Sequence, residues 1–107
     1  MNDLVERLAQ GEHPVIVGGA QPTVSELKRR IHDMGYVFIK FVDTRGGTDL
    51  GVRVDKDATD TSGADFEKAT GTVHVEGTLS LNYVKVRCVA DIDMVTMSGS
   101  GHLVVMD

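Results

Sequence analysis

The C-terminal third of the chain alternates apolar and polar residues. Residues 72–80 and 83–94 each place an apolar side chain, often valine, at every second position. Strict alternation of this kind is typical of β-strands with one buried face. The tetrapeptide at 98–101, Ser-Gly-Ser-Gly, favours a type II′ turn because glycine comes first in a two-residue loop. The pattern therefore predicts two successive β-hairpins between Thr72 and Met106.

Two segments of the N-terminal half have the signatures of helices. Residues 23–34 begin with a capping-box pattern, carry apolar residues at helical spacing and stop at Gly35. Residues 3–10 begin with a second capping-box pattern and contain three apolar residues. We expect one main helix and one short N-terminal helix, both packed on the apolar face of a sheet.

Three more apolar segments have strand character. Residues 14–17 form a brief apolar run, which predicts an edge strand, and residues 50–55 alternate again. Residues 36–42 carry apolar side chains at both odd and even positions, that is, on both faces of a strand. This predicts a central strand covered on both faces. Residues 56–71 have little to bury, so we expect a long exposed loop, and a loop of this length is either functional or mobile.

These elements predict a single domain, residues 1–107, of the α+β class. We expect an antiparallel, meander-like sheet of about five strands, with the main helix packed on its apolar face and the short N-terminal helix beside it. A chain of 107 residues suits one small domain with one core.

Alternation also assigns the side chains of the two hairpins to faces. With a first turn at Leu81-Asn82, Glu76 faces Arg87, and a longer loop shifts the pairs by two without changing the faces. With a second turn at 99–100, Val95 pairs with Val104. One face is then apolar and meets the helices, while the other is polar in its middle and apolar towards the second turn.

The apolar end of that outer face is the predicted partner surface. Its residues are Val95, Met97, His102, Val104 and Met106. Exposed apolar patches mark contact surfaces, and methionines suit adaptable ones. Three interpretations stay open: the patch is covered by the N-terminal segment, by the same patch of a second subunit in a homodimer, or by a different protein.

Charge and cysteine content narrow the class of protein. With 16 acidic and 11 basic residues, the net charge is −5, which argues against nucleic acid as a partner. The N-terminus has no signal-peptide pattern, and no apolar run approaches the roughly 20 residues needed to cross a membrane. Cys88 is the only cysteine, which excludes an intrachain disulfide and fits a reducing compartment. We predict a cytoplasmic protein without a membrane contact.

The polar middle of the outer face offers the best candidate for catalysis. His74, Glu76, Arg87 and Asp91 share it, and this set favours an acid–base or small-anion site. The alternative is a solvated face with cross-strand ion pairs. His74 and His102 lie too far apart in the expected register to share a metal ion, so no metal and no cofactor is predicted.

A second candidate is the glycine-containing loop between the strands at 36–42 and 50–55. Arg45, Gly46, Gly47 and Thr48 can present amide hydrogens and a guanidinium to a carboxylate or phosphate. They predict a binding site for a small anionic ligand. The alternative is that the glycines serve the geometry of the turn.

No catalytic motif decides the function. The sequence lacks a Gly-x-Ser-x-Gly motif, a P-loop, a dinucleotide fingerprint and a Cys-x-x-Cys pair. The leading hypothesis is a non-catalytic binding or accessory module that acts through the open face of its sheet. The alternative is a small cofactor-independent enzyme, an isomerase, cyclase or hydrolase, with a shallow polar site on the sheet. Whether the chain is an enzyme is left open.

Overall fold

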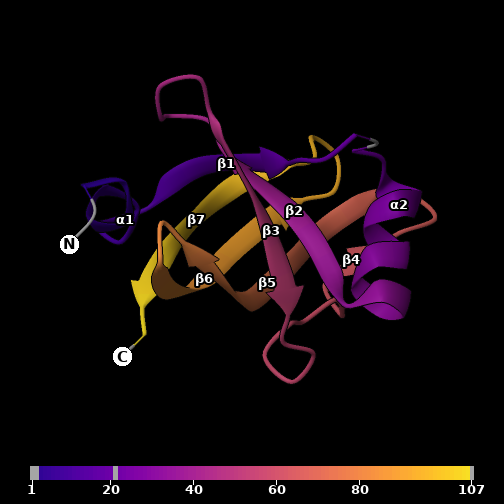
Figure 1. The fold of residues 1–107 in the computed structure, drawn as a ribbon. Helices are drawn as coiled ribbons and strands as arrows, with labels where there is room; N and C mark the ends of the chain where they lie inside the picture. The colour runs from indigo at the N-terminus through magenta and orange to yellow at the C-terminus, as the bar shows by residue number, and fades with distance from the viewer. Residues whose placement is uncertain (1–2, 21, 107) are drawn as a thin grey trace.

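The computed structural model describes residues 3–20 and 22–106, and the fold is mostly β-structure (Figure 1). In this part of the chain the strands are β1 (His13–Val17), β2 (Tyr36–Phe41), β3 (Thr48–Val54), β4 (Ala64–Asp65), β5 (Thr70–Leu81), β6 (Val84–Asp93) and β7 (Ser98–Val105). The helices are α1 (Asp3–Leu8) and α2 (Val24–Arg29), and α2 continues as the π-helical segment η1 (Arg30–Met34).

Six of the strands close into an antiparallel barrel. Neighbouring strands follow the order β3-β2-β1-β7-β6-β5, and β3 pairs back with β5. We call the β3–β5 contact the seam. The short strand β4 is an addition to this barrel and pairs with the start of β5.

The predicted α+β fold was therefore wrong, as was the open sheet of about five strands. The apolar face of the strands is enclosed mainly by other strands and not by the main helix. Alternation has the same period in an open sheet and in a barrel, so it does not reveal closure. The edge-strand prediction for residues 14–17 was also wrong, because β1 pairs with β2 on one side and β7 on the other.

The interior of the barrel is apolar. Its fully buried side chains include Phe41, Ile39, Ile92 and Leu103, with Cys88 beside them. On β5 the interior position next to the seam is Gly77, which lies opposite Val54. A Cβ atom at Gly77 would collide with the carbonyl oxygen of Arg53, so closure of the seam depends on the absence of a side chain there.

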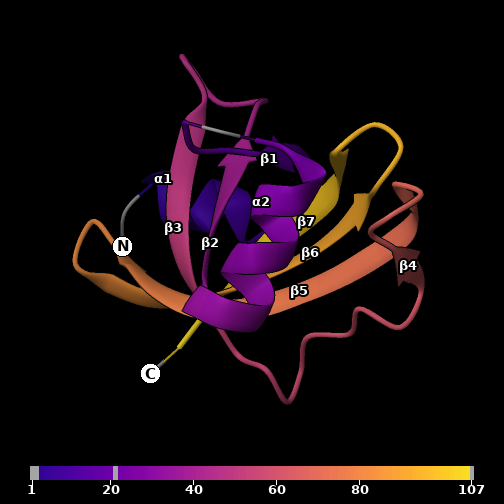
Figure 2. The ribbon, with the colours of Figure 1, turned by 90° about the vertical axis from the view of Figure 1, so that its right-hand side faces the viewer.

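The two predicted helices are confirmed. The hydroxyl of Thr23 accepts a hydrogen bond from the Glu26 amide at 3.2 Å, and the helical segment ends at Gly35, which has a φ of 68°. Leu27 and Ile31 are buried beneath this segment, which lies over one end of the barrel (Figure 2). The short helix α1 lies on the opposite side of the molecule (Figure 1).

The hairpins have the predicted faces but a different register. The first turn is Asn82-Tyr83, and both residues have the positive φ of a type I′ turn, 50° and 68°. In the second hairpin Asp93 pairs with Ser98, so the segment 98–101 belongs to β7 and the predicted turn there was wrong. A Cβ atom at Gly99 would collide with the carbonyl oxygen of Asp91, so this glycine allows close strand contact.

The segment predicted as a long exposed loop is attached to the barrel. The Asp55 amide donates to the Glu76 carbonyl at 2.8 Å, and Asp60 exchanges two backbone hydrogen bonds with His74. Farther along, β4 pairs with β5. We call residues 55–63 the β3–β4 connection. It is a largely exposed loop, as predicted, but it follows the edge of β5 and is hydrogen-bonded to it.

Candidate functional site

The four polar residues predicted to share a face do lie together on the outside of the barrel. His74 on β5 lies directly opposite Asp91 on β6, and Glu76 follows two residues along β5. Arg87 pairs with Thr78 and is therefore diagonal to Glu76. These side chains point outward because the alternate positions of both strands fill the interior.

Short hydrogen bonds link these side chains to one another and to the β3–β4 connection. His74 Nδ1 lies 2.8 Å from Asp91 Oδ1, and its Nε2 lies 2.6 Å from Glu76 Oε2. Arg87 donates from Nε to Glu76 at 2.9 Å and from Nη2 to Asp55 at 2.8 Å. Asp55 was not among the predicted site residues. We call Asp55, His74, Glu76, Arg87 and Asp91 the polar cluster.

The contacts favour one charge state for the polar cluster. Both ring nitrogens of His74 face carboxylates, which accept hydrogen bonds, so this geometry favours the doubly protonated ring. The hydrogen bonds to Glu76 and Asp91 raise the pKa of His74. The bond to His74, together with that from Arg87, lowers the pKa of Glu76, and the bond from Arg87 lowers the pKa of Asp55.

This arrangement favours a structural role for the polar cluster. A general base needs a ring nitrogen that is free to accept a proton from a substrate. Both nitrogens of His74 are occupied by donated hydrogen bonds. Because Arg87 reaches Asp55, the cluster also fastens the β3–β4 connection to the barrel wall.

No candidate metal centre accompanies the polar cluster. Among residues 3–20 and 22–106, no group of three or more His, Cys, Asp or Glu side chains is placed to hold a metal ion.

A pocket opens where the seam ends. β3 and β5 pair only through Arg53–Thr78 and Val54–Gly77. The same register would next bring Val52 opposite Leu79 and then Gly51 opposite Ser80, but neither pair is formed. The two strands therefore diverge, and a pocket of about 410 Å³ lies between them.

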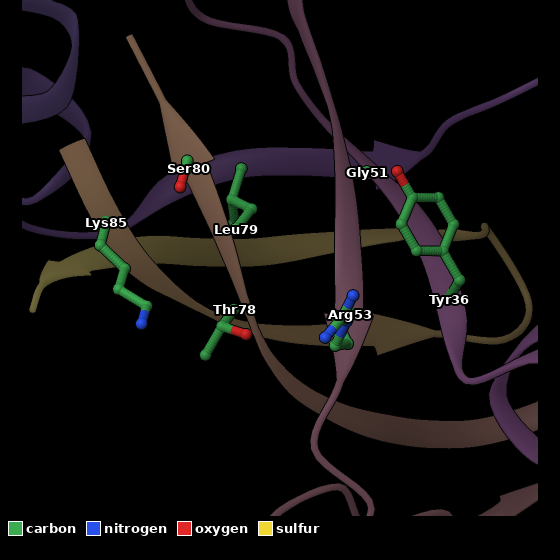
Figure 3. A pocket seen from close by; sticks show the side chains of 7 residues that line it. All are labelled: Tyr36, Gly51, Arg53, Thr78, Leu79, Ser80 and Lys85. Carbon is green, nitrogen blue, oxygen red and sulfur yellow. The ribbon is translucent and has the colours of Figure 1, made fainter. Parts of the chain in front are cut away.

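Seven residues from four strands line this pocket, which we call the seam pocket (Figure 3). They are Tyr36, Gly51, Arg53, Thr78, Leu79, Ser80 and Lys85. The ring of Tyr36 lies across β3, where a Cβ atom at Gly51 would collide with the tyrosine hydroxyl. Gly51 thus leaves room for an aromatic wall on one side of the pocket.

The seam pocket carries two cations and no carboxylate. Arg53 comes from β3 and Lys85 from β6, and Figure 3 shows them on either side of Thr78. Within the described part of the chain, neither cationic group has a hydrogen-bond or ion-pair partner. Both side chains are exposed. The pocket is therefore a positive region on a chain whose net charge is −5.

A second, smaller cavity of about 170 Å³ lies between η1 and the β3–β4 connection. Its lining residues are Ile31, His32, Lys56, Thr59 and Thr61. Here Lys56 donates to the carbonyl oxygen of His32 at 3.3 Å. The cavity therefore lacks the unpaired cations of the seam pocket.

The predicted glycine loop forms the β2–β3 turn. Gly46 and Gly47 have φ values of 73° and 77°, which only glycine adopts easily, and the Gly47 amide donates to Thr44 at 2.9 Å. The Thr48 hydroxyl lies 2.7 Å from that of Thr44, while Arg45 is exposed. The turn accounts for both glycines. The anion site at Arg45–Thr48 stays a prediction.

The predicted partner surface does not form one patch. Its continuity required Val95 to pair with Val104, but Val104 pairs with Arg87. Val95 lies in the β6–β7 loop and is 69% exposed, whereas Val104 lies near the far end of β7 and is 45% exposed. Met97 packs against the core. A protein contact at these residues stays a prediction.

The last two residues of the predicted partner surface also lie on or just beyond β7. His102 contacts the side chain of Glu12, and the Met106 amide donates to the Lys85 carbonyl.

Sequence reasoning missed the residues of the seam pocket. Alternation puts Thr78, Ser80 and Lys85 on the polar face of the first hairpin, and this is the one signal in the sequence that points towards the pocket. Arg53 and Tyr36 reach them only because β3 closes onto β5. That contact joins strands far apart in the sequence, and no local pattern reports it.

Comparisons with known proteins add no family. No family model matches the chain, and no curated protein matches its sequence. Among the described helices, none combines the length and the apolar character that crossing a membrane requires.

Proposed function

We propose that this chain is a non-catalytic binding module that holds a small anionic ligand in the seam pocket. The observation that carries the proposal is the pair of unpartnered cations, Arg53 and Lys85, on either side of the Thr78 hydroxyl. Two like charges that share a pocket repel each other, and an anion between them relieves this repulsion. The volume of about 410 Å³ falls within the range of small-molecule sites.

The chemistry of the lining residues supports binding over turnover. Arginine presents a planar fork of donors, lysine a mobile charge and the hydroxyls further donors, all of which suit an oxyanion. The lining residues include no His, Cys, Asp or Glu. The pocket therefore offers no side chain that exchanges protons readily near neutral pH.

The alternative function, a small enzyme working through His74, Glu76, Arg87 and Asp91, has weaker support. These residues meet as expected, but they bind one another. The hydrogen bonds at both ring nitrogens leave His74 no atom for a substrate proton.

We extend the proposal to a cytoplasmic location. The only cysteine, Cys88, is fully buried, and burial raises the pKa of its thiol to about 12. A thiol in this state is unreactive, and a single cysteine allows no intrachain disulfide, which suits a reducing compartment.

Titration of the ¹⁵N-labelled chain with inorganic phosphate at constant ionic strength tests the proposed site. We expect amide shift changes around Arg53, Thr78 and Lys85. Arg53→Gln and Lys85→Gln should each weaken binding about tenfold, since each removes one charge-assisted contact. The exposed Lys28 on α2 provides a matched control, and Lys28→Gln should leave the affinity unchanged.

Two results would contradict the proposal. One is an affinity that survives the double variant Arg53→Gln/Lys85→Gln. The other is a loss of binding in Arg45→Gln with unchanged binding in Arg53→Gln, which would move the site to the β2–β3 turn.

A further inference from the structure

The donors of the seam pocket outnumber the oxygens of a carboxylate. Arg53 offers five N–H groups, Lys85 three, and Thr78 and Ser80 one hydroxyl each. They project from β3, β5 and β6, so they surround a bound group from several directions. A carboxylate has two oxygens in one plane, whereas a phosphoryl group has three arranged around phosphorus. The donor set therefore matches a phosphoryl group better.

The interrupted ladder adds backbone donors to this set. Asp55 bonds to Glu76 across the seam, and Arg53 pairs with Thr78 in the same register. Because hydrogen-bonding positions alternate along an antiparallel pair, Gly51 and Ser80 point their backbone groups towards the gap. Both residues line the pocket, so their N–H groups are available to an oxyanion bound there.

The placement of the cations favours a ligand with one doubly charged group over a ligand with two separate charged groups. Figure 3 shows Lys85, Thr78 and Arg53 in a row, with the threonine hydroxyl between the two cationic groups. The register agrees, because Thr78 is paired with Arg53 and Lys85 is paired with Ser80, two residues farther along β5. A phosphomonoester carries a charge of about −1.5 to −2 at pH 7, which balances both cations at one position.

The remaining walls suit a flat organic group. Tyr36 is 40% exposed, and its ring meets Phe38 edge-to-face at 5.4 Å between centroids. Its position across Gly51 keeps an aromatic surface at the pocket, with Leu79 as the other apolar residue. Planar groups stack on exposed aromatic rings.

From these four observations we infer that the ligand is a phosphomonoester of a planar organic group. Its phosphoryl oxygens lie between Arg53 and Lys85 over Thr78, and its ring lies against Tyr36. This inference rests on the proposed function and names the chemical class of its ligand.

Calorimetric titration of the full chain at pH 7.5 with phenyl phosphate, inorganic phosphate and benzoate tests it. Phenyl phosphate should bind at least about tenfold more tightly than benzoate, because it carries a second charge. It should also bind about fivefold more tightly than inorganic phosphate, because its ring stacks on Tyr36. Tyr36→Ala should abolish the tighter binding of phenyl phosphate relative to inorganic phosphate. It should leave the affinity for inorganic phosphate unchanged. Tyr83 is fully exposed at the β5–β6 turn and provides the matched control. Tyr83→Ala should change neither the affinity for phenyl phosphate nor that for inorganic phosphate.

Each contrary outcome has a distinct meaning. Equal binding of benzoate and phenyl phosphate, with shift changes at the seam pocket, would overturn the phosphomonoester and leave the proposed function standing. Equal binding of phenyl phosphate and inorganic phosphate would overturn the planar group. If none of the three probes binds, both the inference and the proposed function fail.

Discussion

Two histidines in this protein have carboxylate partners that raise their pKa. His13 repeats the arrangement of His74, since its Nδ1 lies 2.8 Å from Asp43 Oδ2 and its Nε2 lies 2.9 Å from the Gln10 carbonyl oxygen. Both acceptors require a donating nitrogen. The hydrogen bond to Asp43 raises the pKa of His13. Each ring joins segments that lie far apart in the sequence.

These contacts make stability depend on pH in a definite direction. A histidine with a raised pKa contributes fully below its ordinary value of 6.5, and the contribution is lost as the pH rises through the raised pKa. Glu76, with a lowered pKa, contributes above its ordinary value of 4.5 and loses its contribution as the pH falls through the lowered pKa. The polar cluster is therefore most stabilising between these two ordinary values.

We predict that His74→Gln lowers the free energy of unfolding by about 0.5–1 kcal/mol near pH 6, since the ion pairs are partly exposed. The difference from the unsubstituted chain should shrink as the pH rises through the raised pKa of His74. Urea unfolding at several pH values measures the loss of unfolding free energy and its change with pH. His32→Gln is the control, because the described residues provide no carboxylate partner for His32. A constant difference for His74→Gln would show that the ion pairs contribute nothing.

At the scale of elements, alternation and capping signals predicted most strands, both helices and the two faces of the hairpins. Val73, Val75 and Ile92 alternate with polar residues in the sequence, and they line the barrel interior. The register of β6 and β7 was not predictable from turn chemistry. Glycines at 99 and 101 satisfy a turn pattern and a closely packed strand equally well, and the choice depends on the neighbouring strand.

Local sequence patterns predict neither the closure of the barrel nor the presence of the seam pocket. Both depend on Gly77, whose missing side chain lets β3 approach β5. We predict that Gly77→Ala lowers the free energy of unfolding by about 2–3 kcal/mol, because the new methyl group meets the backbone of Arg53 and the Val52 side chain. Denaturant titration measures the loss.

Thr72 on the same strand provides the comparison for this substitution. Its side chain is exposed, so Thr72→Ala should change stability by less than about 1 kcal/mol. An equal effect of the two substitutions would mean that the seam tolerates a side chain and that its closure has another cause.

At the scale of the whole molecule, the barrel seals its only thiol. Cys88 has no exposed surface and a raised pKa of about 12. We predict that a thiol-specific reagent at pH 8 modifies it at least about 1,000-fold more slowly than in the unfolded chain, because reaction requires the barrel to open. The variant Thr72→Cys supplies an exposed thiol in the same molecule and should react rapidly. Equally fast reaction of both thiols would show that the barrel opens readily.

The pairing of β1 with β7 sets the order in which the barrel can form. His13 lies opposite Gly101, so β1 cannot complete its pairing until β7 has been synthesised. Contacts between such distant segments form slowly, because the chain must close a long loop before any contact is gained. Until β7 leaves the ribosome, β1 and β6 each lack a neighbour and their apolar sides are uncovered. The nascent chain, and not the finished barrel, is thus the form of this protein most exposed to aggregation.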